Sequence, residues 1–131
     1  MTEDNEIKKG NIYYAKLDPI VGSEQNGTRP VVVVQNDIGN KYSPTILIAP
    51  ITSKVYSKPN LPTHVILKAN GKITHDSIIL LEQIRVIDKS RLSSYLCDLK
   101  PYQIEQIDRA LINAFDLKIQ LEVKNVSQKK K

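Results

Sequence analysis

Alternating apolar and polar positions predict several short β-strands before residue 100. Residues 11–17 alternate so that Tyr13, Ala15 and Leu17 share one face, which is the pattern of a half-buried strand. Residues 31–34 are four consecutive valines, and such a β-branched run predicts a strand buried on both faces. Further strands are predicted at residues 45–52, 63–68, 77–87 and 91–97.

Polar, turn-rich segments separate these strands. Residues 18–30, 36–44 and 53–62 are predicted to be irregular, and Asn70-Gly71 predicts a hairpin-type turn. An uninterrupted strand over 77–87 would place Leu81, Gln83, Arg85 and Ile87 on one face and Glu82 on the other.

The hydrophobic period changes after Pro101, a residue that suits the first position of a helix. Apolar side chains then recur at helical spacing, at Ile104, Ile107, Leu111 and Ala114/Phe115. They predict an amphipathic helix that ends near Leu117, unless Ile119 and Leu121 prolong it. Many short strands followed by one helix predict a mainly β fold of the α+β class or a small barrel.

Length and composition fit one globular domain, with 131 residues of which 40% are hydrophobic and 25% charged. The apolar stretches are too short to span a bilayer and the N-terminus is polar, so we expect a cytoplasmic protein without a membrane partner. The formal net charge is +5, but residues 118–131 hold five lysines and one glutamate and so supply +4 of it. Because residues 1–117 are nearly neutral, the total charge says little about nucleic acid.

The sequence contains no motif that predicts a metal site or a cofactor site. The chain has no HExxH motif, no cysteine cluster and no phosphate-binding glycine loop, so we expect neither a metal nor a cofactor. Cys97 is alone and has apolar neighbours, which favours a place in the core. Two histidines and a lysine can in principle cleave RNA by acid–base chemistry. His75 is expected on the surface, whereas His64 is either a hydrogen-bonded structural residue or part of a groove.

The long connection over 18–30 ends in Arg29-Pro30, and the proline restricts Arg29 to an extended backbone. The planar guanidinium of arginine suits phosphate oxygens. Thr52 and Ser53 add two hydroxyls at the end of another predicted strand. From these residues alone, Arg29 is either an anion-binding residue or a surface salt-bridge residue.

Five sequence segments follow one another along the chain: GSEQNGTRPVVVVQND at 22–37, SPT at 43–45, IT at 51–52, LPTHV at 61–65 and DSIILLEQIR at 76–85. Together they resemble one known family, the MazF/PemK toxin endoribonucleases, in the same order and with similar spacing. The motifs are most similar to those of the family's Gram-positive branch. The similarity covers residues 9–117, outside which lie a polar leader (1–8) and a basic tail (118–131).

The resemblance implies an SH3-like small β-barrel of the MazF/CcdB type with a C-terminal α-helix, assembled as a homodimer. It also implies the toxin of a type II toxin-antitoxin system, with a MazE-like antitoxin that occupies the RNA groove. The implied activity is metal-independent, sequence-specific cleavage of single-stranded RNA such as mRNA at a U/A-rich motif like UACAU. In that reaction the 2′-OH attacks the neighbouring phosphorus and leaves a 2′,3′-cyclic phosphate and a 5′-OH.

Arg29 matches the catalytic arginine of the family and Thr52 its catalytic threonine. The positions expected at or near the RNA groove are Ser23, Glu24, Asn36, Ser53, His64 and Gln83. Because arginine is essentially never deprotonated in proteins, the acceptor of the 2′-OH proton stays open between Glu24, His64 and water. Tyr42 or Tyr56 is a candidate for stacking on a base.

A second function remains open, that of a non-enzymatic toxin of the same fold that binds a protein, like the CcdB gyrase poisons. Those toxins rely on a terminal tryptophan, and this chain has no Trp. The loop signature over 22–37 also favours the ribonuclease branch. A third alternative is an inactive or purely RNA-binding relative, and the presence of both Arg29 and Thr52 argues against it.

Overall fold

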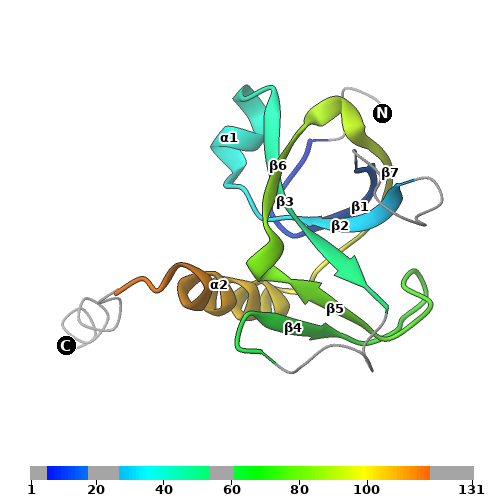
Figure 1. Ribbon diagram of the computed structural model, residues 1–131. Helices are drawn as coiled ribbons and strands as arrows, with labels where there is room; N and C mark the ends of the chain where they lie inside the picture. Colours follow the sequence, from blue (N-terminus) through cyan, green and yellow to red (C-terminus); the bar gives the residue numbers. More distant parts are fainter. Residues whose placement is uncertain (1–5, 18–26, 54–60, 119–131) are drawn as a thin grey trace, which may run out of the picture.

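The computed structural model describes residues 6–17, 27–53 and 61–118, which form one strongly bent antiparallel sheet with a helix packed against it (Figure 1). The strand order is β4-β5-β3-β2-β1-β7, and β6 pairs with β3 beside this path. The strands are β1 (Asn11–Lys16), β2 (Thr28–Val33), β3 (Thr45–Thr52), β4 (His64–Leu67), β5 (Ser77–Leu80), β6 (Arg85–Asp88) and β7 (Leu92–Asp98). The helices are α1 (Asp37–Tyr42), α2 (Pro101–Phe115) and the short 3-10 turns η2 (Leu81–Gln83) and η3 (Lys89–Arg91).

Strand β3 organises the barrel because its two halves have different partners. Its first half pairs with β6, from Thr45↔Asp88 onward, and its last two residues pair with β5. On its other edge it pairs with β2. The shared strand turns the sheet over on itself, which closes it into the expected small barrel.

The valine run is buried on both faces, as predicted. Val32 and Val34 pack in a cluster with α2, β4 and β5, whereas Val31 and Val33 pack in a second cluster with β1 and β6. Tyr13, Ala15 and Leu17 are buried together in the second cluster, again as predicted. Alternation along the strands therefore supplies both halves of the core.

Helix α2 agrees with the predicted amphipathic segment and lies beside β4 and η2 (Figure 1). The side chain of Gln103 accepts a hydrogen bond from the backbone N–H of Lys100 at 2.7 Å, which closes the N-terminus. The helix ends at Asp116, whose backbone is left-handed with φ at +55°. Ile107 and Ala110 are buried in the first core cluster.

Two local predictions were wrong. The predicted strand over 77–87 is broken by η2, where Leu81 turns into the core and its N–H donates to the carbonyl of Thr63 at 3.0 Å. Gln83 therefore lies on η2, whereas Arg85 and Ile87 still share a face of β6, opposite Ile48 and Ile46 of β3. The polar segment 36–44 contains helix α1. The hairpin-type turn at Asn70-Gly71 is confirmed, since β4 and β5 pair antiparallel through a connection over residues 68–76. No helix in the described ranges is long and apolar enough to cross a membrane.

Candidate active site

A cavity of about 240 Å³ lies where the ends of β2 and β3 separate, beside the β4–β5 connection. It is smaller than sites that enclose a drug-sized molecule, which have about 300–1,000 Å³, so it suits one segment of a larger ligand. Its polar lining residues are Tyr14, Arg29, Thr52, Ser53, Lys72, Thr74, His75 and Ser77.

The register of the sheet places Arg29 and Thr52 at this cavity. The ladder between β2 and β3 ends at the pair Val31↔Pro50. Continued by two residues, the same register brings Arg29 opposite Thr52. Pro30 holds the backbone of Arg29 extended and has no N–H to prolong the ladder, so the strands part at this point. A guanidinium and a hydroxyl, more than 20 residues apart in the sequence, therefore line one cavity.

The connection between β4 and β5 supplies the opposite wall with Lys72, Thr74 and His75. Its own hydrogen bonds give it a defined shape. The side chain of Asn70 accepts the N–H of Lys72 at 2.7 Å, and the hydroxyl of Ser77 donates to the carbonyl of His75 at 2.9 Å. This wall is therefore a structured turn rather than a loose loop.

The cavity is suited to an anion. Arg29 and Lys72 contribute cationic groups, and no Asp or Glu lines the cavity among the residues that the structure describes. Arginine can bind phosphate oxygens in pairs, and hydroxyls such as that of Thr52 can donate to a non-bridging oxygen. The arrangement can therefore hold a phosphate and stabilise additional negative charge on it.

The other expected site residues lie elsewhere or outside the described ranges. Asn36 caps α1, where its side chain accepts the N–H of Gly39 at 2.7 Å. Tyr42 is 74% exposed on α1 and does not line the cavity. Gln83 lies on η2 and does not line it either, whereas Ser53 does. Ser23, Glu24 and Tyr56 fall outside the described residues.

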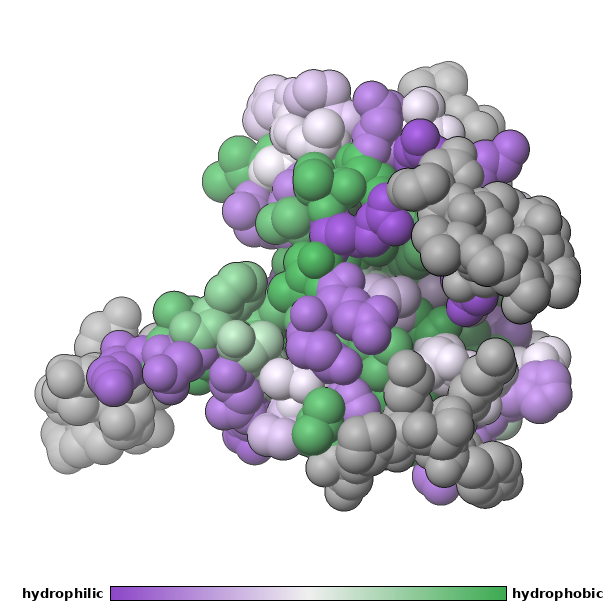
Figure 2. Space-filling view, in the orientation of Figure 1, coloured by the Kyte–Doolittle hydropathy of each residue, from purple (hydrophilic) through white to green (hydrophobic). Residues whose placement is uncertain are grey.

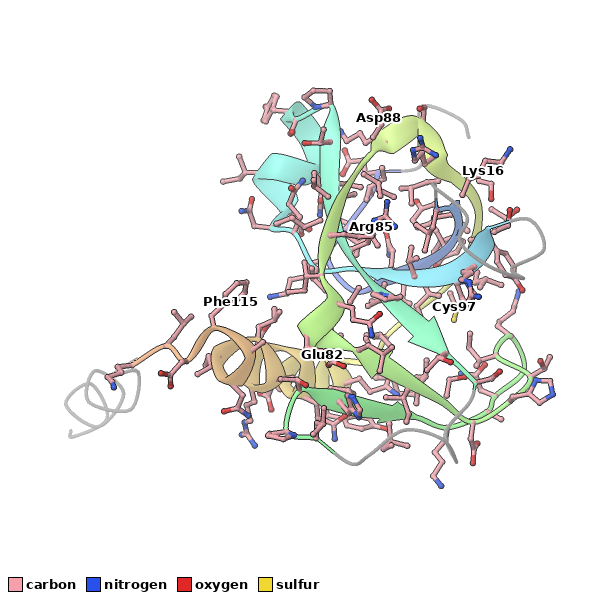
Figure 3. The ribbon with its side chains drawn as sticks, viewed as in Figure 1. Lys16, Glu82, Arg85, Asp88, Cys97 and Phe115 are labelled. Atoms are coloured by element: carbon pink, nitrogen blue, oxygen red, sulfur yellow. The ribbon has the colours of Figure 1, made fainter. Side chains whose placement is uncertain are left out.

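His64 is a buried, hydrogen-bonded residue away from the cavity, the first of its two predicted alternatives. Its side chain is 2% exposed, and Nε2 lies 3.2 Å from Oε2 of Glu82. The other oxygen of Glu82 accepts the hydroxyl of Thr63 at 2.7 Å. Burial alone would raise the pKa of Glu82, but hydrogen bonds from Thr63, its own backbone and His64 outweigh this effect and lower the pKa. In Figure 3 Glu82 lies on η2, where it ties η2 to the start of β4.

Cys97 on β7 is half-buried and packs against the first core cluster, which agrees with the predicted core position (Figure 3). Burial, with a smaller contribution from Asp98, raises the pKa of the thiol. This shift disfavours the thiolate and so does not support a nucleophile. In the described ranges, no three His, Cys, Asp or Glu side chains converge in a way that could hold a metal ion.

Lys72 and His75 are among the cavity residues that sequence reasoning missed. His75 is exposed, as predicted, but its place in the cavity of Arg29 depends on β5 pairing with the end of β3 at Thr52↔Ile78. A hairpin prediction joins β4 to β5 without saying which strand lies next to them.

The chain matches one known protein family in sequence and several solved structures in fold. The sequence profile of the family described as "PemK-like, MazF-like toxin of type II toxin-antitoxin system" matches residues 8–115. The solved "Mycobacterium tuberculosis toxin MazF-mt6" is similar in structure, with a TM-score of 0.70 at 24% identity over 83% of this chain and 99% of that chain. An "Endoribonuclease in complex with its cognate antitoxin" from a mycobacterial species has a TM-score of 0.69 at 21% identity, over 86% and 98% of the two chains.

A third similar structure is that of MazE-MazF from Deinococcus radiodurans, with a TM-score of 0.70 at 21% identity over 88% of this chain and all of that chain. At these identities the solved structures show the fold, a mostly antiparallel barrel with a C-terminal helix.

Proposed function

The chain belongs to the PemK-like, MazF-like toxin family of type II toxin-antitoxin systems, and from this premise we propose that it is a sequence-specific endoribonuclease that cleaves single-stranded RNA such as mRNA. The observation that carries the proposal is that Arg29 and Thr52 line one cavity, although they come from different strands. These are the two positions that match the family's catalytic residues. The cavity's charge and size suit one phosphodiester of a longer chain.

Arg29 and Thr52 have distinct roles in the proposed reaction. The 2′-oxygen of the substrate attacks the adjacent phosphorus, and the bond from phosphorus to the 5′-oxygen breaks. Arg29 stabilises the negative charge that accumulates on the phosphorane, and Thr52 donates a hydrogen bond to a non-bridging oxygen. The products are a 2′,3′-cyclic phosphate and a 5′-OH, and the reaction requires neither a metal nor a cofactor. We expect it to take place in the cytoplasm, where mRNA is found.

A homodimer is the second part of the proposal, and an exposed apolar surface supports it. A groove is lined by residues of β3, η2, β6 and the end of α2, among them Leu47, Val86 and Phe115. These three side chains are 40%, 57% and 62% exposed. Figure 2 shows apolar surface between the barrel and α2, and in Figure 3 Phe115 stands at the last turn of α2. Large exposed apolar patches mark interaction sites, so we assign this one to the second copy that the resemblance implies.

A MazE-like antitoxin is the third part of the proposal. Two of the similar solved structures are complexes of a toxin of this fold with its antitoxin. We place the antitoxin over the cavity of Arg29 and Thr52, because an acidic segment there would compete directly with the RNA backbone for the same cations.

A pair of matched oligonucleotides tests the reaction. One is an all-RNA substrate with a mapped cut, and the other carries a single 2′-deoxy nucleotide on the 5′ side of that cut. We expect cleavage of the first and none of the second, because the nucleophile is missing. Equal cleavage of both would mean that an external nucleophile attacks, which contradicts the proposed chemistry.

A further inference from the structure

His75 is the only imidazole among the described residues that line the cavity of Arg29 and Thr52. The chain has two histidines, and the other, His64, is buried against Glu82 away from the cavity. His75 is exposed at the end of the β4–β5 connection, and its Nδ1 lies 3.0 Å from the hydroxyl of Thr74. It is therefore both accessible and oriented by a neighbour that lines the same cavity.

The proposed reaction needs an acceptor for the 2′-OH proton, and a side chain that lines the cavity is placed to provide it. Arginine is essentially never deprotonated in proteins, and a lysine ammonium has donors but no acceptor, so neither Arg29 nor Lys72 suits this role. The hydroxyls of Thr52 and Ser53 are weak bases. Histidine is the side chain whose charge ordinarily changes between about pH 5 and 8, which suits proton transfer near neutral pH.

We propose that His75 is the general base of the cleavage, an inference that rests on the proposed ribonuclease function. Its Nδ1 lies 3.0 Å from the hydroxyl of Thr74. The proposal requires the tautomer in which Nδ1–H donates to that hydroxyl, because this tautomer leaves Nε2 as the proton acceptor. The O2′–H bond breaks and the proton moves to Nε2 while O2′ bonds to phosphorus. As the bond to the 5′-oxygen breaks, that oxygen takes a proton from water, and the hydroxide so formed recovers the proton from the imidazolium.

The charged and titratable groups around His75 are compatible with this role. Tyr14 on β1, Arg29 on β2 and Lys72 on the connection itself line the same cavity. The neighbouring carboxylate, Asp76, accepts the N–H of Ala69 at 2.8 Å and lies 3.8 Å from the ammonium of Lys68. It does not line the cavity, so no carboxylate joins the imidazole among the described residues that line it.

The first test compares His75→Gln with wild type in single-turnover cleavage of an RNA oligonucleotide that contains the mapped cut. Loss of a general base costs about 10²-fold or more, and we expect that loss near neutral pH. A general base acts only in its unprotonated form, so the wild-type rate should rise with pH over the range in which the protein stays folded. The variant should lack this rise. Lys68→Gln is the matched control, because it changes a cation on the same connection but outside the cavity, and we expect a rate close to wild type.

Two further measurements separate a base from a merely structural residue. The cleavage rate of the His75→Ala variant should increase in proportion to the concentration of added neutral imidazole. The wild-type rate should not change. A substrate with sulfur in place of the leaving 5′-oxygen needs no proton on its leaving group, so the defect of His75→Gln should persist with it. Restoration of the rate by that sulfur substrate would make His75 an acid and would overturn the inference.

The inference and the function on which it rests fail in different ways. A wild-type protein that leaves every RNA intact overturns the proposed function and the role of His75 with it. A wild-type protein that cleaves RNA, beside a His75→Gln variant with the same rate and pH profile, overturns the role of His75 alone.

Discussion

Replacement of Arg29 by alanine tests the electrostatic part of the mechanism. The guanidinium lines a cavity of about 240 Å³, and no Asp or Glu is among the described residues that line this cavity. Removal of one strong transition-state donor costs about 10²–10³-fold in rate, or about 2.7–4 kcal/mol. Because Arg29 lies at the half-buried end of β2 rather than in either core cluster, we expect the loss in catalysis with a nearly unchanged melting temperature.

The assay is single-turnover cleavage of a short RNA with a mapped cut, beside thermal unfolding of the same preparations. Arg29→Lys keeps the charge but loses the planar fork, so its rate should lie between those of wild type and Arg29→Ala. Arg109→Ala is the control, since this exposed arginine on α2 does not line the cavity. Cleavage by Arg29→Ala within a few-fold of wild type would refute the reasoning, as would a loss that follows a collapse of the melting temperature.

Four further predictions follow from other parts of the molecule. Thr52→Val should slow single-turnover cleavage about 10-fold, the cost of one hydrogen bond to a charged oxygen; an unchanged rate would remove Thr52 from the mechanism. The pKa of Glu82 is lowered in the folded protein, so the Glu82 carboxylate stabilises the fold at pH values above its ordinary pKa of 4.5. This stabilisation is lost as the pH falls through the lowered pKa. The melting temperatures of wild type and Glu82→Gln should therefore converge below about pH 4.5, and a constant difference would contradict the contact with His64. Val86→Glu should give monomers in sedimentation and lose activity, whereas an active monomer would count against the dimer. Truncation after Leu117 should leave the cut motif unchanged, because the basic tail lies outside the matched region; a new motif would show that the tail reads RNA.

Much of the fold could be predicted because it depends on short-range patterns. The strand over 45–52 agrees with β3 to the residue, and the valine run divides between the two core clusters as its burial on both faces requires. Helix α2 follows from Pro101 and its apolar spacing.

The missed elements depend on tertiary contacts. Helix α1 has six residues, too few to show a helical period, and its buried Asn40 donates to the backbone carbonyl of Gln35 at 2.9 Å. The break at η2 occurs because Leu81 packs in the core and bonds Thr63 across to β4. Neither contact can be recognised from the amino-acid composition of the segment in which it occurs.

The residues of the candidate site also fall into two groups, those that the sequence indicates and those that depend on tertiary contacts. Arg29 and Thr52 follow from the resemblance, and the β2–β3 register explains why they meet. His75 could not be placed from the sequence, since its position depends on β5 pairing with the end of β3. An exposed histidine beside a turn is a typical surface residue until the neighbouring strand is known.

Digestion of a long, mixed-sequence RNA in excess EDTA, with both new ends mapped and Arg29→Ala run in parallel, tests the central claim most directly. The account predicts cuts at one short motif that carry a 2′,3′-cyclic phosphate and a 5′-OH and that are lost in the variant. Intact RNA in the presence of folded, antitoxin-free protein would contradict the account and would favour a toxin that binds a protein target.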